Sequence, residues 1–184
     1  YAGGKYSDYS PKYMRGINQW VDNGGTLIGI RQGADWVGKN ILNGKNEKER
    51  KRQIKRDKNP KVDKEKESKD KKIQRYKYAE KESRDPLNVI GGTIFSGNLD
   101  ITHPIGFGYK NENVALHKNT TSILPRPNNP YATVIEYQNK PVISGYASEE
   151  NKKKLANTAA LIAERKGKGS IILFADDPNF RAAW

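Results

Sequence analysis

The feature that most constrains the fold of this chain is a short apolar run that ends in a glycine-bounded turn. Residues 25–35 have the sequence G-T-L-I-G-I-R-Q-G-A-D. The apolar, partly β-branched run from Thr26 to Ile30 predicts a buried strand, and the residues from Ala34 onward have helical character. A strand, a tight turn and a helix in this order are typical of the elbow that lifts a reactive Ser or Cys above the strand ends of an open α/β sheet, in the pattern G-x-nucleophile-x-G.

The tip of this elbow carries an arginine in place of a nucleophile. The frame is Gly29-Ile30-Arg31-Gln32-Gly33, and the 184 residues include no cysteine, which excludes disulfides, thiolate zinc sites and Cys nucleophiles. Two interpretations of Arg31 stay open. It is a scaffold residue on a loop whose ancestor was catalytic, or its guanidinium binds an anion at the mouth of the strands, where open sheets place ligands. Gln32 can contribute to either.

A second candidate group follows the apolar run 170–174, which also predicts a buried strand. Asp176 and Asp177 are paired carboxylates, which can bind a metal or act as acid and base. Asp177 also precedes a proline and is a good helix N-cap, so helix capping is the alternative interpretation. We predict that strands 26–30 and 170–174 lie in one parallel sheet, with Arg31 and Asp177 at the same edge, where an ion pair would satisfy both side chains.

The histidines do not support a metal site within this chain. His103 and His117 are the only two, and no H-x-x-E or H-E-x-x-H pair exists, so no metal-binding residues are expected. His103 stands in the turn-like sequence D-I-T-H-P, and we predict that it is bonded to the backbone. It stays a candidate ligand-binding residue beside the four strand-end residues named above.

A strongly charged segment interrupts the globular sequence. Between Gly44 and Asp85 the chain has 18 Lys/Arg and 10 Asp/Glu, while the formal net charge of the whole chain is +13. Because the two signs are interleaved and apolar residues are sparse, we expect a solvated, partly mobile helical excursion and no specific nucleic-acid binding. We expect the points of contact with the body to be Ile73, Tyr76 and Tyr78. An alternative is a basic module, Lys45–Arg84, that anchors the protein to an anionic surface.

The remaining residues predict one domain of alternating strands and helices. Ser10 and Pro11 begin a helix as N-cap and first residue, and Asn23-Gly24-Gly25 end it. Further expected strands lie at 89–95, 121–124, 133–137 and 142–144, and residues 98–108 predict the end of another strand that runs into a tight loop. Two stripes of apolar residues at helical spacing mark buried helix faces, namely Met14, Ile17, Trp20 and Val21, and Leu155, Ala159, Ile162 and Ala163. The final helix is expected from residue 176.

Two stretches carry a family resemblance. Residues 20–33, W-V-D-N-G-G-T-L-I-G-I-R-Q-G, resemble the centre of class I glutamine amidotransferase-like domains. In the active family the elbow carries Cys and a His-Pro-Glu follows the last strand. Here Arg31 replaces the Cys, Asp177 the His and Asn179 the Glu. The resemblance implies a three-layer, flavodoxin-like fold with a mostly parallel sheet, interrupted by the charged insertion at about 45–85, and no amidotransferase activity.

A finer resemblance is to the amidotransferase-like domain at the C-terminal end of certain large bacterial zinc carboxypeptidases of the carboxypeptidase A type. It is carried by the segments 99–109, 144–146, 150–151 and 173–181. It implies a secreted or periplasmic parent whose zinc and catalytic residues lie upstream, and an accessory domain that packs against the peptidase domain or recruits peptide substrate. The alternative is a domain that binds, or hydrolyses, a small or anionic ligand through Arg31, Gln32 and Asp177.

Both ends of the sequence look like the ends of a piece excised from a longer protein. It begins with Tyr1 and stops at Trp184 in an expected first helical turn, so we expect a fragment of a longer protein. No signal peptide is visible and no run of about 20 apolar residues exists, so no membrane span is expected.

Overall fold

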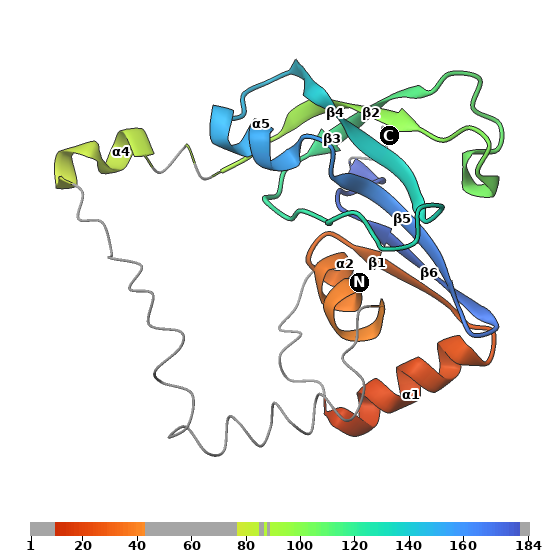
Figure 1. Ribbon diagram of the computed structural model, residues 1–184. Helices are drawn as coiled ribbons and strands as arrows, with labels where there is room; N and C mark the ends of the chain where they lie inside the picture. Colours follow the sequence, from red (N-terminus) through yellow and green to blue (C-terminus); the bar gives the residue numbers. More distant parts are fainter. Residues whose placement is uncertain (1–9, 43–76, 85–86, 88, 181–184) are drawn as a thin grey trace.

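A computed structural model of the chain describes residues 10–42, 77–84, 87 and 89–180. In this part of the chain, a six-stranded sheet is flanked by a few short helices (Figure 1). The strands are β1 (Thr26–Ile30), β2 (Thr93–Leu99), β3 (Asn113–Lys118), β4 (Thr133–Ser144), β5 (Ala159–Lys166) and β6 (Gly169–Phe174). The α-helices are α1 (Pro11–Asp22), α2 (Gln32–Val37), α4 (Lys81–Arg84) and α5 (Glu149–Leu155). A π-helical turn, Gly38–Leu42, extends α2.

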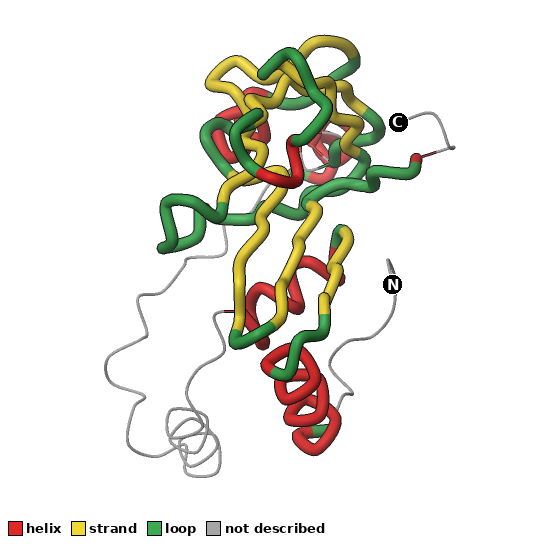
Figure 2. The backbone as a smooth tube through the Cα atoms, turned by 90° about the vertical axis from the view of Figure 1, so that its right-hand side faces the viewer, coloured by secondary structure: helices red, strands yellow, loops and turns green. Residues whose placement is uncertain are grey.

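The sheet is mixed and curls into a half-barrel (Figures 1 and 2). Its strand order is β1-β6-β5-β4-β2-β3. β1 and β6 are parallel, whereas the other four neighbouring pairs are antiparallel. The prediction of a mostly parallel, three-layer, flavodoxin-like fold is therefore wrong. The narrower prediction, that strands 26–30 and 170–174 pair in parallel, is confirmed by the register from Thr26↔Ser170 to Ile30↔Phe174.

The difference from the predicted fold arises where the stripe of Leu155, Ala159, Ile162 and Ala163 predicts one continuous helix. α5 ends at Leu155, and Asn157 takes a left-handed backbone with φ 59°. The chain then enters β5, whose first four residues are all buried. The second half of the predicted helix is therefore a strand. Because β5 and β6 are joined by a tight turn, β6 runs antiparallel to β5.

The first helix follows its sequence signals. Ser10 is the N-cap, its side chain accepts a hydrogen bond from the backbone N–H of Tyr13, and Pro11 is the first helical residue. Met14 and Val21 are buried in the core, but Trp20 is 53% exposed, so the predicted apolar stripe is only partly covered. The helix ends at Asn23, and Gly24 supplies a positive φ of 120°.

The C-terminal end of α1 docks onto the turn between β5 and β6. Lys166 donates to the Asp22 carboxylate at 2.7 Å, and the Lys168 N–H donates to the Asp22 carbonyl at 2.9 Å. Gly169 allows the close approach, because a Cβ atom built there would stand 2.1 Å from the carbonyl oxygen of Val21. These contacts hold α1 against the turn of the β5–β6 hairpin, and Figure 2 shows the helix lying at that end of the strands.

The core lies on both faces of the curled sheet. Beneath α1 and α2 it includes Ala34, Ile171 and Leu173, and beneath α5 it includes Phe95 and Tyr137. Strand β3 was not predicted, and Thr133–Tyr137 and Val142–Ser144, expected as two strands, form the single strand β4. Thr121–Leu124, expected as a strand, contributes only an isolated bridge from Leu124 to Ala159. The strand expected at 89–95 begins at Thr93 and runs to Leu99. The prediction that residues 98–108 are a strand end running into a tight loop is confirmed, because turns and a 3₁₀ turn, Pro104–Gly106, follow Leu99.

Most of the charged segment lies outside the described residues. Its described end forms a 3₁₀ turn, Tyr78–Glu80, followed by α4, which stands away from the body in Figure 1. Tyr78 is 86% exposed, and the Lys81 ammonium lies 5.8 Å from the centre of its ring. The expected contact of Tyr78 with the body is therefore wrong, while Ile73 and Tyr76 fall outside the described part. Residues 178 and 179 form a turn, so the helix expected from residue 176 does not begin there, and residues 181–184 fall outside the described part.

Candidate functional site

The site begins at the elbow, whose backbone is strained. Arg31 has φ 56° and ψ −122°, a conformation that is rare for any residue with a Cβ atom. The neighbouring strand holds it in place, because the Arg31 N–H donates to the Phe174 carbonyl at 2.8 Å. The Arg31 carbonyl accepts from the N–H groups of Ala34 and Asp35 in the first turn of α2. The structure therefore contains the sharp strand-to-helix turn that the sequence predicts.

Glycines make room for this turn. A Cβ atom on Gly29 would stand 2.9 Å from the Cα atom of Ala34, so the last part of β1 and the first turn of α2 touch backbone to backbone. Gly33 is buried at the same contact. A glycine on each side of the tip is what a nucleophile elbow requires, since both flanks pack without side chains.

A buried ionic network lies beyond the carboxyl end of β6. Lys118 is fully buried, and its ammonium donates to the Asp176 carboxylate at 2.8 Å and to the Ser122 carbonyl at 2.7 Å. The Tyr137 hydroxyl donates to the other oxygen of Asp176. Burial, followed by the nearby Asp176 carboxylate, raises the pKa of Tyr137 well above its usual value of 10.0. Tyr137 is therefore a neutral phenol at ordinary pH.

Curling of the sheet brings this network together. Lys118 is the last residue of β3, at one edge of the sheet, whereas Asp176 follows β6, next to the other edge. The loop after β3 then returns across the strand ends, where the Ser122 hydroxyl donates to the Asp35 carboxylate at 2.8 Å. The elbow, this loop and the segment after β6 therefore meet at one end of the half-barrel.

The sequence-predicted residues divide into two groups. Arg31 and Gln32 follow β1, and Asp176 and Asp177 follow β6. Because these two strands are parallel, all four residues lie beyond the carboxyl ends of the strands, at the same end of the sheet as predicted. His103 lies at the other end of the sheet. β2 begins at Thr93, which pairs with Lys118 near the ionic network, and His103 follows the far end of this strand. Its predicted backbone bond is confirmed: the Ile105 N–H donates to its Nδ1 at 3.1 Å.

The expected ion pair between Arg31 and Asp177 is not present among the described residues. Asp177 accepts a hydrogen bond from the Asn179 N–H at 3.0 Å, which is a local turn contact of the kind that a capping Asp makes. Gln32 is exposed, and Asp176 belongs to the buried network. The four residues therefore share an edge without forming one hydrogen-bonded cluster.

Sequence reasoning missed Lys118, Tyr137, Ser122 and Asp35. A lysine at the end of a strand is almost always solvent-exposed, so nothing in the local sequence marks Lys118 as buried. Its partner Asp176 lies 58 residues further along the chain. The tyrosine gives a weak signal, because an inward-facing Tyr in an alternating strand needs a polar partner for its hydroxyl.

The other residues near this end do not add catalytic groups. The ring of His117 stacks on that of Phe180, with centroids 3.9 Å apart and planes at 15°. No group of three His, Cys, Asp or Glu side chains in the described part of the chain is placed to hold a metal ion. Two surface hollows lie along the outer side of α1 and between β4 and α5, and neither is lined by an elbow residue.

The arrangement can hold charge, but the tip of the elbow carries no nucleophile for acyl transfer. A guanidinium stays protonated in proteins and does not attack carbonyl groups. Lys118 is engaged by three acceptors, counting the Tyr137 oxygen at 3.5 Å, and has no exposed surface. The elbow therefore presents a fixed cation where an acyl-transfer enzyme presents its reactive group.

Comparisons with models of known protein families, with curated proteins and with solved structures yield no match. Among the helices that the structure describes, none has both the length and the apolar character needed to cross a bilayer.

Proposed function

We propose that this chain is a catalytically silent accessory domain of a larger secreted zinc metallocarboxypeptidase. The observation that supports a catalytically silent domain is the identity of the residue at the tip of the elbow. Arg31 holds the strained backbone of a nucleophile elbow, yet its side chain cannot act as a nucleophile. The geometry of a catalytic turn without its reactive group is typical of a domain that has kept its scaffold for binding or packing.

The groups around the elbow support the same proposal. Acid–base catalysis needs a group that can exchange a proton with substrate at the working pH. Tyr137 is buried with a raised pKa, and Lys118 and Asp176 neutralise each other inside the half-barrel. Lys118 and Tyr137 have no exposed surface, so we propose that these three residues serve the fold.

The parent protein is proposed from the sequence resemblance of the segments 99–109, 144–146 and 173–181 to the C-terminal domain of bacterial zinc carboxypeptidases. The zinc and its ligands would belong to a peptidase domain upstream, outside the cell or in the periplasm. This chain would pack against that domain or recruit its peptide substrate. The proposal uses the elbow and these segments, and it does not require a flavodoxin-like sheet.

Two measurements test this function. The purified chain is incubated with glutamine and with peptides, with and without added zinc, and we expect turnover no faster than in buffer. Turnover that is lost in both Arg31→Ala and Asp177→Ala would show an active site at the strand ends and overturn the proposal. The coding sequence upstream of Tyr1 is the second measurement, and we expect an H-x-x-E pair followed by a later His. A complete upstream sequence without these ligands would remove the peptidase parent.

A further inference from the structure

The side chain of Arg31 combines partial burial with a lack of polar partners in the described part of the chain. Its Nε atom is inaccessible to solvent and makes no hydrogen bond to any residue that the structure describes. No carboxylate in the described ranges forms an ion pair with its guanidinium either. A buried donor that belongs to a charged group costs stability unless an acceptor satisfies it. The Arg31 guanidinium therefore has no anionic partner among the described residues, and a bound anion would satisfy it.

The carboxylates near the elbow accept hydrogen bonds from donors other than Arg31. Asp176 accepts from Lys118 and Tyr137, and Asp35 accepts from the Ser122 hydroxyl. Asp177 accepts from the N–H of Asn179. Each nearby acid therefore has a hydrogen-bond partner other than Arg31.

The backbone at Arg31 gives an independent reason to assign a role to this residue. An L-residue with φ 56° and ψ −122° costs stability, and such outliers gather at ligand and active sites, where the surrounding structure enforces them. Glycine would adopt this conformation without strain. The strained conformation instead holds a long cationic side chain at the carboxyl ends of the parallel pair β1 and β6.

A second buried polar atom lies on the loop that packs against the elbow helix. The Thr120 hydroxyl is inaccessible to solvent and has no hydrogen-bond partner within the described part of the chain. Its loop is attached to α2 through the bond between Ser122 and Asp35. Two of the three segments that meet at this end of the half-barrel thus carry an unsatisfied polar group.

We infer that the elbow is an oxyanion-binding site, in which the Arg31 guanidinium holds a carboxylate or phosphate group of a ligand. The planar guanidinium offers parallel N–H donors that match both kinds of anion. The inference rests on this side chain and its strained backbone, and not on the N-terminus of α2, which is only 6 residues long. It goes beyond the proposed accessory role, because binding here would need no peptidase parent.

The test follows the Nε–H signals of arginine in the N–H correlation spectrum of the whole chain. Sodium acetate and sodium phosphate are titrated separately at constant ionic strength, with sodium chloride as the reference salt, so that general screening is held fixed. We expect the Arg31 signal to shift and saturate with a dissociation constant in the millimolar range for at least one of the two anions. Saturation by acetate identifies a carboxylate ligand, and saturation by phosphate alone identifies a phosphoryl ligand.

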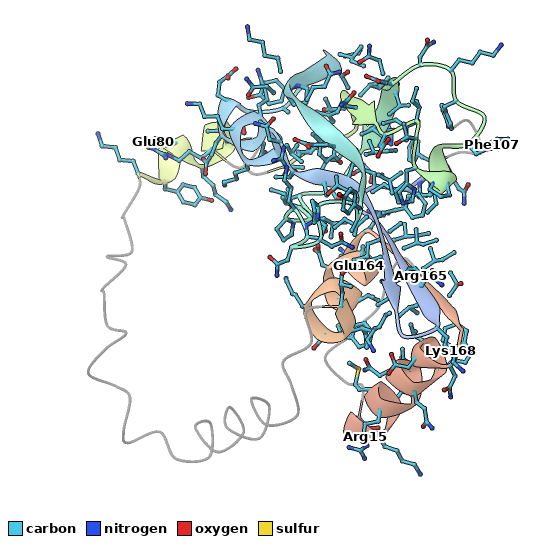
Figure 3. All side chains as sticks on the ribbon, turned by 45° about the vertical axis from the view of Figure 1, so that its right-hand side comes forward. Arg15, Glu80, Phe107, Glu164, Arg165 and Lys168 are labelled. Carbon is cyan, nitrogen blue, oxygen red and sulfur yellow. The ribbon has the colours of Figure 1, made fainter. Side chains whose placement is uncertain are left out.

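Three variants complete the test. Arg31→Gln removes the cation and should abolish the saturable response, as followed on the backbone N–H signals around the elbow. Arg15→Gln removes an equal charge from the exposed outer side of α1, which Figure 3 shows, and should leave the response unchanged. Arg31→Lys keeps the charge without the planar fork, should bind more weakly, and serves if Arg31→Gln fails to fold.

Absence of any saturable shift in the folded wild-type chain would overturn the inference, as would a response that survives Arg31→Gln. Neither result bears on the catalytic silence tested above, because that assay measures turnover and this one measures binding. Conversely, turnover at the strand ends would overturn the proposed function while leaving the anion site in place.

Discussion

At the scale of single residues, Lys118 links the end of β3 to the segment that follows β6. It is fully buried and paired with Asp176. We predict that Lys118→Met lowers the free energy of unfolding by about 3–5 kcal/mol, because it leaves a buried carboxylate without its cation. The measurement is urea denaturation followed by circular dichroism.

The control for Lys118 is a double variant. Replacing both charges by apolar residues removes the uncompensated carboxylate, so Lys118→Met with Asp176→Leu should be more stable than Lys118→Met alone. A double variant whose loss equals the sum of the two single losses would contradict the pairing. The exposed pair of Lys154 and Glu150 on α5 is a useful reference, because its removal should cost little.

Tyr137 makes the stability of the protein sensitive to alkaline pH. Its pKa is raised by burial and by the Asp176 carboxylate, whereas the unfolded chain releases the phenol proton near 10.0. The stabilisation that the protonated Tyr137 gives the folded state is therefore fully present below about pH 10. It is lost as pH rises from there toward the folded-state pKa, because over that range the unfolded state binds fewer protons than the folded state. We predict that urea denaturation between about pH 8 and 11 shows this fall and that Tyr137→Phe reduces its slope. An unchanged slope in Tyr137→Phe would assign the fall to other groups.

At the scale of elements, two glycines with opposite surroundings test how α1 docks on the β5–β6 turn. A Cβ atom on Gly169 would collide with backbone atoms of Val21 and Gly25, whereas one on Gly16, in the middle of α1, would meet nothing within 4 Å. We predict that Gly169→Ala lowers the melting temperature by several degrees, since rigid backbone must move. Gly16→Ala should raise it, because alanine favours helix by up to about 1 kcal/mol. A stable Gly169→Ala variant would mean that α1 can shift without loss.

The elements also show which parts of the structure a sequence can predict. Helix α1, strand β1 and the elbow carry local signals, namely the Ser10–Pro11 cap, a β-branched run and flanking glycines, and all of them form as predicted. Strand β5 is not predicted by its sequence, because the Ala-rich segment Ala159–Lys166 favours a helix in isolation. Its pairing is decided by β4 and β6 on either side and by the left-handed Asn157 that ends α5.

The candidate site divides in the same way. Arg31, Gln32, Asp176 and Asp177 could be predicted at one edge because each directly follows a strand of a parallel pair. Lys118 and Tyr137 could not, since their contacts with Asp176 depend on the curvature of the whole sheet and join residues 58 and 39 positions apart. Sequence patterns report which face of an element is apolar, but they do not report how far a sheet curls.

At the scale of the whole molecule, the charged segment should be dispensable for the fold. Its described end, residues 77–84, is mostly exposed, and α4 stands away from the body (Figure 1). We predict that replacing Lys45–Arg84 by a short Gly/Ser linker changes the melting temperature by only a few degrees, because sparse apolar residues bury little surface. Thermal unfolding of the two chains is the measurement. Loss of cooperative unfolding in the shortened chain would show that the segment carries core contacts.

The strand order has a consequence for how this protein is made. Among the described residues, β1 pairs with β6 alone, and the two strands lie near opposite ends of the described chain. During synthesis, the apolar sequence T-L-I-G-I leaves the ribosome on the order of ten seconds before the strand that will cover its edge. Throughout that interval it is an unpaired edge strand, open to neighbouring nascent chains. Chaperone demand and yield in cells should therefore respond more to translation speed and to substitutions in β1 than the equilibrium stability of the finished fold would suggest.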